Sequence, residues 1–94
     1  LPTAVETVTT SQTVSSDVLT YMGDTSGGDI TMTFNLVGEV YTEGQVWNFK
    51  KVASSNQFII SITGGTIDGA SSINIATIYD NAAVQYDGSN FIII

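Results

Sequence analysis

Apolar and polar residues alternate along much of the chain. The clearest alternation covers residues 29–36, where apolar side chains occupy every second position: Ile30, Met32, Phe34 and Leu36. Because successive side chains of a strand point to opposite faces of a sheet, this period of two predicts a strand with one buried face. No stretch of about eleven residues keeps the apolar spacing of an amphipathic helix. We therefore expect an all-β chain.

The alternation and the residues at its breaks together predict about eight short strands. Glycine, aspartate, asparagine and serine gather at the breaks, where they supply positive φ angles and side-chain caps for tight reversals. Short strands spaced about ten residues apart indicate one domain over residues 1–94, built as an antiparallel β-sandwich or barrel. The predicted strands cover residues 4–9, 12–20, 29–36, 45–52, 57–63, 72–79, 82–87 and 90–94.

Two segments, Phe58–Ile60 and Phe91–Ile94, carry more apolar residues than one buried face requires. In a sandwich of this size only one face of each sheet can meet the core, so the surplus predicts an interface between subunits. The alternative is a single, unusually apolar monomer. An exposed apolar edge strand at the chain end would invite aggregation, so we expect residues 90–94 to be buried at a central or intersubunit position.

The strand over residues 45–52 can face the core in two ways. Trp47 and Phe49 favour burial of one face, which leaves Lys50 in solvent, whereas Val46 lies on the opposite face. Both faces could be covered. Trp47 beside Phe49 is more typical of a core residue than of a platform for stacking sugar rings.

The composition excludes several kinds of chemistry. The 94 residues include no histidine, cysteine or arginine, and nine acidic residues against two lysines give a net charge of −7 at pH 7. Thiolate catalysis, Cys/His zinc sites and a Ser-His-Asp triad within this chain are therefore ruled out. The negative charge argues against binding to nucleic acid or to anionic membranes. No apolar run approaches the roughly 20 residues that a membrane-spanning helix needs.

Carboxylates are the only acid and base candidates, and a glycosidase-like carboxylate pair is the one hydrolytic mechanism that they allow. Their positions favour another interpretation. Asp24, Asp68 and Asp87 lie beside or near glycine and Asp80 precedes Asn81, places where aspartate caps a turn through backbone hydrogen bonds. We expect a protein that is not an enzyme and has no catalytic residue.

A metal ion or cofactor is not expected either. Calcium needs clustered oxygen ligands, yet the chain contains no Asp-x-Asp-x-Asp-Gly loop. Its densest acidic turn, residues 24–29, is better explained as a connection between strands.

Three segments in the second half of the chain occur in a recognisable order: Gly44–Asn56, Gly65–Gly69 and Val84–Ile93. Their sequences are GQVWNFKKVASSN, GTIDG and VQYDGSNFII. They resemble the C-terminal head domains of trimeric bacteriophage and related viral fibre, spike and tail-needle proteins. There, an aromatic strand ending in Lys-Lys precedes Thr-Ile-Asp-Gly and a closing Asp-Gly-Ser-Asn-aromatic-x-Ile-Ile. The resemblance covers roughly residues 29–94, and Phe91 stands where the family often has tryptophan.

The resemblance implies a jelly-roll-like β-sandwich head at the tip of a homotrimeric fibre on the virion surface. Such a head assembles the trimer and attaches it to a glycan or protein receptor on the host, with no nucleic acid and no membrane insertion. The trimer interface would then be lined by Phe91, Ile92, Ile93 and Ile94. Residues 1–10 could connect the head to a longer fibre chain.

Receptor contacts are expected at the ends of loops, where exposed tyrosine and acidic side chains can meet a partner. Tyr21, Asp24 and Tyr41 are the candidates. Two alternatives to an attachment head remain. One is a purely structural trimerisation, capsid or tail decoration domain, and the other is a monomeric carbohydrate-binding module with an aromatic platform.

Overall fold

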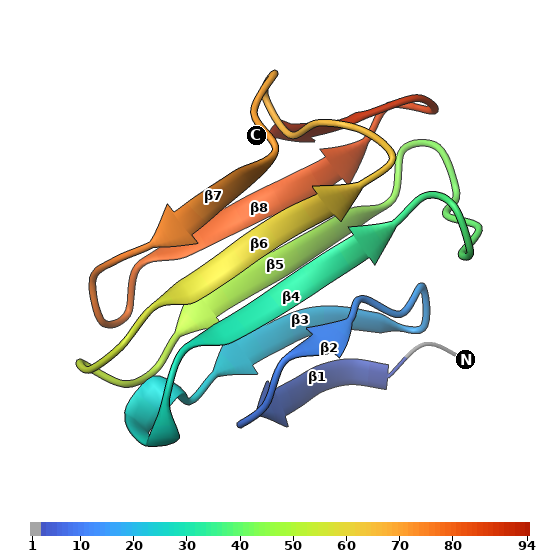
Figure 1. Ribbon diagram of the computed structural model, residues 1–94. Helices are drawn as coiled ribbons and strands as arrows, with labels where there is room; N and C mark the ends of the chain where they lie inside the picture. The colour runs from blue at the N-terminus through green and yellow to red at the C-terminus, as the bar shows by residue number, and fades with distance from the viewer. Residues whose placement is uncertain (1–2) are drawn as a thin grey trace.

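The computed structural model describes residues 3–94 and confirms an all-β chain (Figure 1). Within these residues nine strands are joined by loops and by one turn of 3₁₀ helix, η1. The elements are β1 (Thr3–Val8), β2 (Gln12–Thr13), β3 (Val18–Gly23), η1 (Thr25–Gly27), β4 (Ile30–Asn35), β5 (Val46–Lys51), β6 (Phe58–Thr63), β7 (Ser72–Ile75), β8 (Asn81–Tyr86) and β9 (Phe91–Ile93).

The strands form two layers, a five-stranded sheet β1-β3-β5-β8-β9 and a four-stranded sheet β2-β4-β6-β7 (Figure 1). From β1 to β6 the chain passes to the other sheet after every strand. When the chain comes back to a sheet, the new strand therefore runs in the same direction as the previous strand of that sheet. The pairs β1/β3, β3/β5, β2/β4 and β4/β6 are parallel. Only β5/β8, β6/β7 and β8/β9 are antiparallel. The predicted antiparallel arrangement is thus wrong for the first six strands, because their turns cross between sheets instead of forming hairpins.

Two successive coils of the chain stack in the same register. Tyr21 pairs with Phe49 in the five-stranded sheet, and Ile30 pairs with Phe58 in the other, so both partners lie 28 positions further along the chain. The first coil is shorter, since Thr3 pairs with Val18. Beyond β6 the antiparallel strands β7, β8 and β9 end this stacked arrangement.

Two predicted strands and one predicted connecting segment differ most from the structure. The strand expected over 12–20 is interrupted between β2 and β3, because the chain crosses there from one sheet to the other. The strand expected over 72–79 ends at Ile75, and Tyr79 in the following turn has a φ of +66°. Thr3–Val8, within the stretch considered as a connecting segment, pairs with β3 as a strand of the five-stranded sheet.

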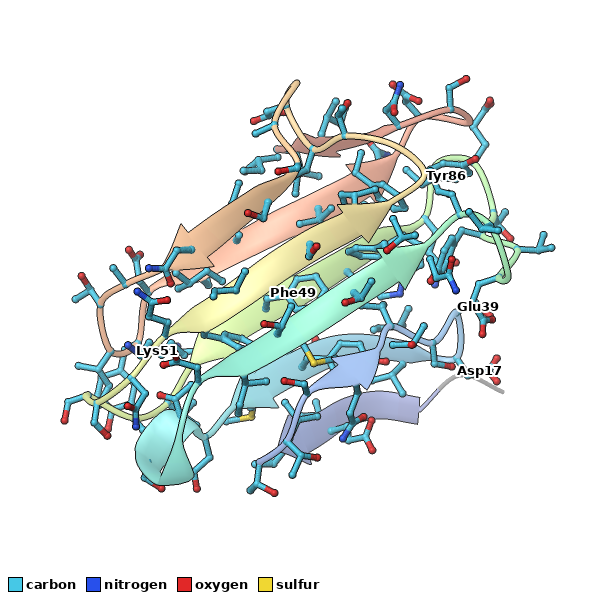
Figure 2. The ribbon with its side chains drawn as sticks, viewed as in Figure 1. Asp17, Glu39, Phe49, Lys51 and Tyr86 are labelled. Carbon is cyan, nitrogen blue, oxygen red and sulfur yellow. The ribbon has the colours of Figure 1, made fainter. Side chains whose placement is uncertain are left out.

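Aromatic side chains from both sheets meet in the core. Phe34 of β4 lies 5.0 Å from Trp47 and 5.7 Å from Phe49 of β5, measured between ring centroids. All three rings are fully buried, and Figure 2 shows Phe49 between the two layers. Such edge-to-face pairs add about 0.5–1.5 kcal/mol each beyond the area that they bury. Burial of Ile30, Met32 and Phe34 confirms the face predicted from their alternation.

The inward face of β5 continues past the aromatic residues to a lysine. Trp47 and Phe49 point into the core, Lys50 is exposed, and Lys51 is 1 % exposed. The Lys51 ammonium group donates hydrogen bonds to the carbonyl oxygens of Asn56 and Ala76. These carbonyls belong to the β5–β6 and β7–β8 connections, so one buried side chain ties two turns together.

Candidate functional site

The three segments that carry the viral resemblance meet at one end of the two sheets. Gly44 donates its backbone N–H to the Tyr86 carbonyl at 2.8 Å, and the Phe91 N–H reaches the Thr66 carbonyl at 2.9 Å. The Asp68 N–H donates to the Phe91 carbonyl at 3.0 Å. Segments that are separate in the sequence thus form one hydrogen-bonded unit around β9.

The chain itself covers the outer edge of β9. Besides the two backbone bonds at Phe91, the Asp68 carboxylate accepts the Ile93 N–H at 3.1 Å. The Asn90 side-chain oxygen accepts the Thr66 N–H at 3.0 Å. Free strand edges can pair with further chains, and side chains or loops that occupy them prevent this. Residues 66–68 perform this role for β9.

Ile92, Ile93 and Ile94, which we call the isoleucine ridge, remain in solvent at this covered edge. Their side chains are 36 %, 39 % and 63 % exposed, whereas Phe91 is 1 % exposed. The Phe91 ring packs on the Phe34 ring, with 4.2 Å between the ring centroids. β9 is an edge strand, so the central position considered for residues 90–94 is wrong. Of the four residues predicted to line an interface, Phe91 is covered by its own chain and three present surface to a partner.

Two of the three predicted receptor contacts are core residues. Tyr21 and Tyr41 are 1 % and 6 % exposed, so the prediction that they meet a receptor is wrong. Their rings lie in the core, and the hydroxyl group of a buried tyrosine needs a hydrogen-bond partner. The Tyr21 hydroxyl accepts the Ser15 N–H at 2.8 Å, and the Tyr41 hydroxyl donates to the Val14 carbonyl at 2.9 Å. Burial raises the pKa of both phenols.

Asp24, the third predicted contact, is partly exposed and caps η1. One of its carboxylate oxygens accepts the Ser26 N–H at 3.2 Å. Hydrogen bonds from the Ser26 side chain and backbone hold the pKa of Asp24 below its ordinary value. Asp87 similarly accepts the N–H groups of Asn90 and Ser89 at 2.8 Å, and these bonds lower its pKa. The interpretation of both carboxylates as turn caps is confirmed.

A second exposed apolar feature was missed by the sequence prediction. It lies in the β4–β5 connection, residues 36–44, which we call the valine loop. Val37 and Val40 are 80 % and 88 % exposed. Both valines lie between predicted strands, outside any alternating run, and this was the available signal: strongly apolar residues with no sheet face to occupy.

Hydrogen bonds hold the valine loop in place. The Asn35 side-chain oxygen accepts the N–H groups of Val37 and Gly38 at 3.1 and 3.3 Å, and the Asn35 carbonyl accepts that of Glu39 at 2.9 Å. The buried Tyr41 side chain anchors the next part of the loop, and its hydroxyl accepts the Asn35 N–H at 3.2 Å. The exposed side chains therefore project from an ordered backbone.

Four connections, the valine loop among them, gather at one end of the sheets (Figure 1). This end carries Asp17, Glu39, Glu43, Asp68 and Asp87. Both lysines occupy the last two positions of β5, at the opposite end, where Lys50 lies 5.9 Å above the Tyr79 ring. Figure 2 shows Asp17 and Glu39 near one end and Lys51 at the other. Within residues 3–94, the valine-loop end therefore has no cationic side chain.

The described residues enclose no pocket of ligand size and bring together no group of three or more side chains suited to a metal ion. Between residues 3 and 94 no helix has the length and apolar character for crossing a bilayer. The two exposed apolar features are therefore the surfaces from which a function can be argued. Comparisons of the chain with protein-family models, curated proteins and solved structures gave no match.

Proposed function

We propose that this chain is a non-catalytic head domain of a trimeric viral fibre, spike or tail needle, displayed on the virion surface. It assembles the trimer and attaches it to a receptor on the host surface. The observation that carries the proposal is the isoleucine ridge, whose three aliphatic side chains are exposed beside the buried ring of Phe91. Removal of such side chains from water is favourable by about 25 cal/mol per Å² of apolar surface, and association gains the part of this that exceeds the entropy cost of binding.

The covered edge of β9 favours a closed assembly over an open one. Because Thr66 and Asp68 occupy the outward backbone groups of Phe91, a second chain cannot extend the sheet there by strand pairing. Contact through the ridge is left to side chains. Side-chain packing around a symmetry axis gives rings of defined size, whereas repeated edge pairing gives fibres of no defined length. Three copies around one axis would bury Ile92 and Ile94 together.

Attachment is assigned to the loops at one end of the sheets. Loops held on a rigid scaffold are common places for recognition, and the hydrogen bonds of Asn35 and Asp87 order two of the loops here. Of the predicted contacts only Asp24 is accessible, and it lies at the other end. The carbohydrate-binding module is disfavoured because the rings of Tyr21 and Tyr41, the tyrosines expected at the surface, are buried and cannot stack on a sugar.

The test of assembly compares two kinds of variant on the five-stranded sheet. Ile92→Thr with Ile94→Thr keeps β-branched side chains but removes the apolar ridge, and multi-angle light scattering should show a shift from trimer to monomer. Val5→Thr is the matched control, because Val5 is 52 % exposed on the opposite edge strand, and it should leave the trimer intact. A ridge variant that stays trimeric would contradict the proposed interface.

A second experiment separates attachment from a purely structural role. The ridge variant is fused to a foreign trimerisation module within the parent fibre, and adsorption to host cells is measured. Restored adsorption with the wild-type loops, lost again in a trimer with altered loops, supports a receptor-binding head. Adsorption that depends only on the trimer, whatever the loops, indicates a structural trimerisation or decoration domain.

A further inference from the structure

We propose that the valine loop is a docking surface for a basic protein, whose positively charged side chains surround a small apolar recess. This inference rests on the proposed attachment role and adds to it the chemical class of the partner. It starts from Val37 and Val40, two aliphatic side chains that are almost fully in solvent. Single exposed apolar residues are ordinary, but two together on an ordered loop are typical of a contact surface.

The loop is arranged for binding before any partner arrives. The Glu39 N–H donates to the Asn35 carbonyl, which closes one turn of backbone that includes Val37 and leads directly into Val40. Tyr41 follows this turn and anchors it to the core, where its ring centroid lies 5.4 Å from that of Trp47 and 5.5 Å from that of Phe34. A loop that is already ordered loses less conformational entropy on binding, so small apolar contacts contribute more to affinity.

The surrounding charge selects the class of partner. Glu39 lies between the two valines in sequence, and the Glu43 carboxylate lies against Gly88. With Asp17 and Asp87 at the same end and both lysines at the other, this surface is negative. It would repel phosphate-bearing partners and a second copy of itself, and attract lysine and arginine side chains.

A neutral glycan fits this surface less well than a protein does. Sugar recognition commonly uses an exposed aromatic face, and the tyrosine of this loop is 6 % exposed. Valine side chains instead fit into shallow apolar recesses between the basic residues of a protein partner.

The test uses backbone amide NMR of the whole chain with three defined probes. The first is a capped peptide that alternates leucine and lysine, the second replaces leucine with serine at equal charge, and the third is a neutral maltooligosaccharide. We expect the leucine-lysine peptide to shift the amides of residues 36–44 and to bind about tenfold more tightly than the serine-lysine peptide. Added salt should weaken both complexes.

Variants assign the binding to the loop. Val37→Ser with Val40→Ser should abolish the preference for the leucine peptide, and Glu39→Gln should weaken binding of both peptides. Val5→Ser and Asp80→Asn, which change an exposed valine and an exposed aspartate elsewhere, should leave affinity unchanged. Equal shifts at other acidic turns, stronger binding of the oligosaccharide, or loop shifts that depend only on protein concentration would overturn the inference. The last two outcomes would indicate a glycan or a second copy.

The result is independent of the assembly test. Loop shifts in a chain that is monomeric at all concentrations would support the docking surface while contradicting the trimeric head. A trimer in which none of the three probes shifts the loop amides would contradict the docking surface while supporting the trimeric head.

Discussion

The isoleucine ridge and the valine loop both expose aliphatic side chains, yet their surroundings differ. The ridge lies at the end of a strand whose outer edge is occupied by residues 66–68, and the Asp68 carboxylate accepts the Ile93 N–H. The valine loop lies on a turn held by Asn35 and includes Glu39. Apolar exposure alone therefore does not specify a partner. The occupied strand edge favours contact through side chains at the ridge, and the charge of Glu39 favours a basic partner at the loop.

The largest expected effect is on the free energy of unfolding, and it distinguishes the buried Phe91 from the exposed isoleucine ridge on the same strand. Phe91→Ala removes a ring that contacts Phe34, Tyr86 and Tyr41 in the core. Loss of a buried phenylalanine costs about 3–5 kcal/mol in the free energy of unfolding, because a cavity remains. Urea denaturation under conditions that keep the chain monomeric measures this cost. Ile92→Ala on the same strand should cost less than about 1 kcal/mol, and equal costs would contradict the division between core and ridge.

The next effect is at the end opposite the valine loop. Lys51→Met keeps the length of the side chain but leaves the Asn56 and Ala76 carbonyls without their donor. We expect the free energy of unfolding to fall by about 1–3 kcal/mol, the usual cost of stranding buried polar groups. Lys50→Met, at the exposed neighbouring position, should change it by less than about 0.5 kcal/mol. Binding of the leucine-lysine peptide should survive in both variants, since neither touches the loop.

The smallest effect is a pH dependence in the turn beside the valine loop. Hydrogen bonds from Asn90 and Ser89 lower the pKa of Asp87 from its ordinary value of 3.8 in the folded chain. The stability that these bonds contribute is therefore complete above pH 3.8 and is lost as the pH falls through the lower, folded value. Melting temperatures of the wild type and Asp87→Asn should differ by a constant amount between about pH 6 and pH 5, and the difference should shrink as the pH falls through 3.8 towards the folded value. A difference that does not change with pH would refute the assignment.

The parts of this fold that depend on local pattern could be predicted from the sequence. The inward face of β4 follows from the alternation of Ile30, Met32 and Phe34, because side-chain direction in a strand depends only on position. The capping roles of Asp24 and Asp87 follow in the same way from their neighbours. These features need no knowledge of how distant segments pair.

The rest depends on pairing between distant segments. The parallel arrangement follows from turns that cross between sheets, and Tyr21 and Phe49 share a register without resembling each other beyond an aromatic ring. Lys51 was missed as an inward residue because lysines are almost always exposed. Tyr21 and Tyr41 were mistaken for surface residues because they lie next to predicted loops in the sequence, although their rings belong to the core.

Sedimentation velocity of the unaltered chain over micromolar concentrations tests the central claim most directly. The account predicts one species with three times the mass of a single chain, held together through Ile92, Ile93 and Ile94. A single-chain mass at every concentration would contradict it.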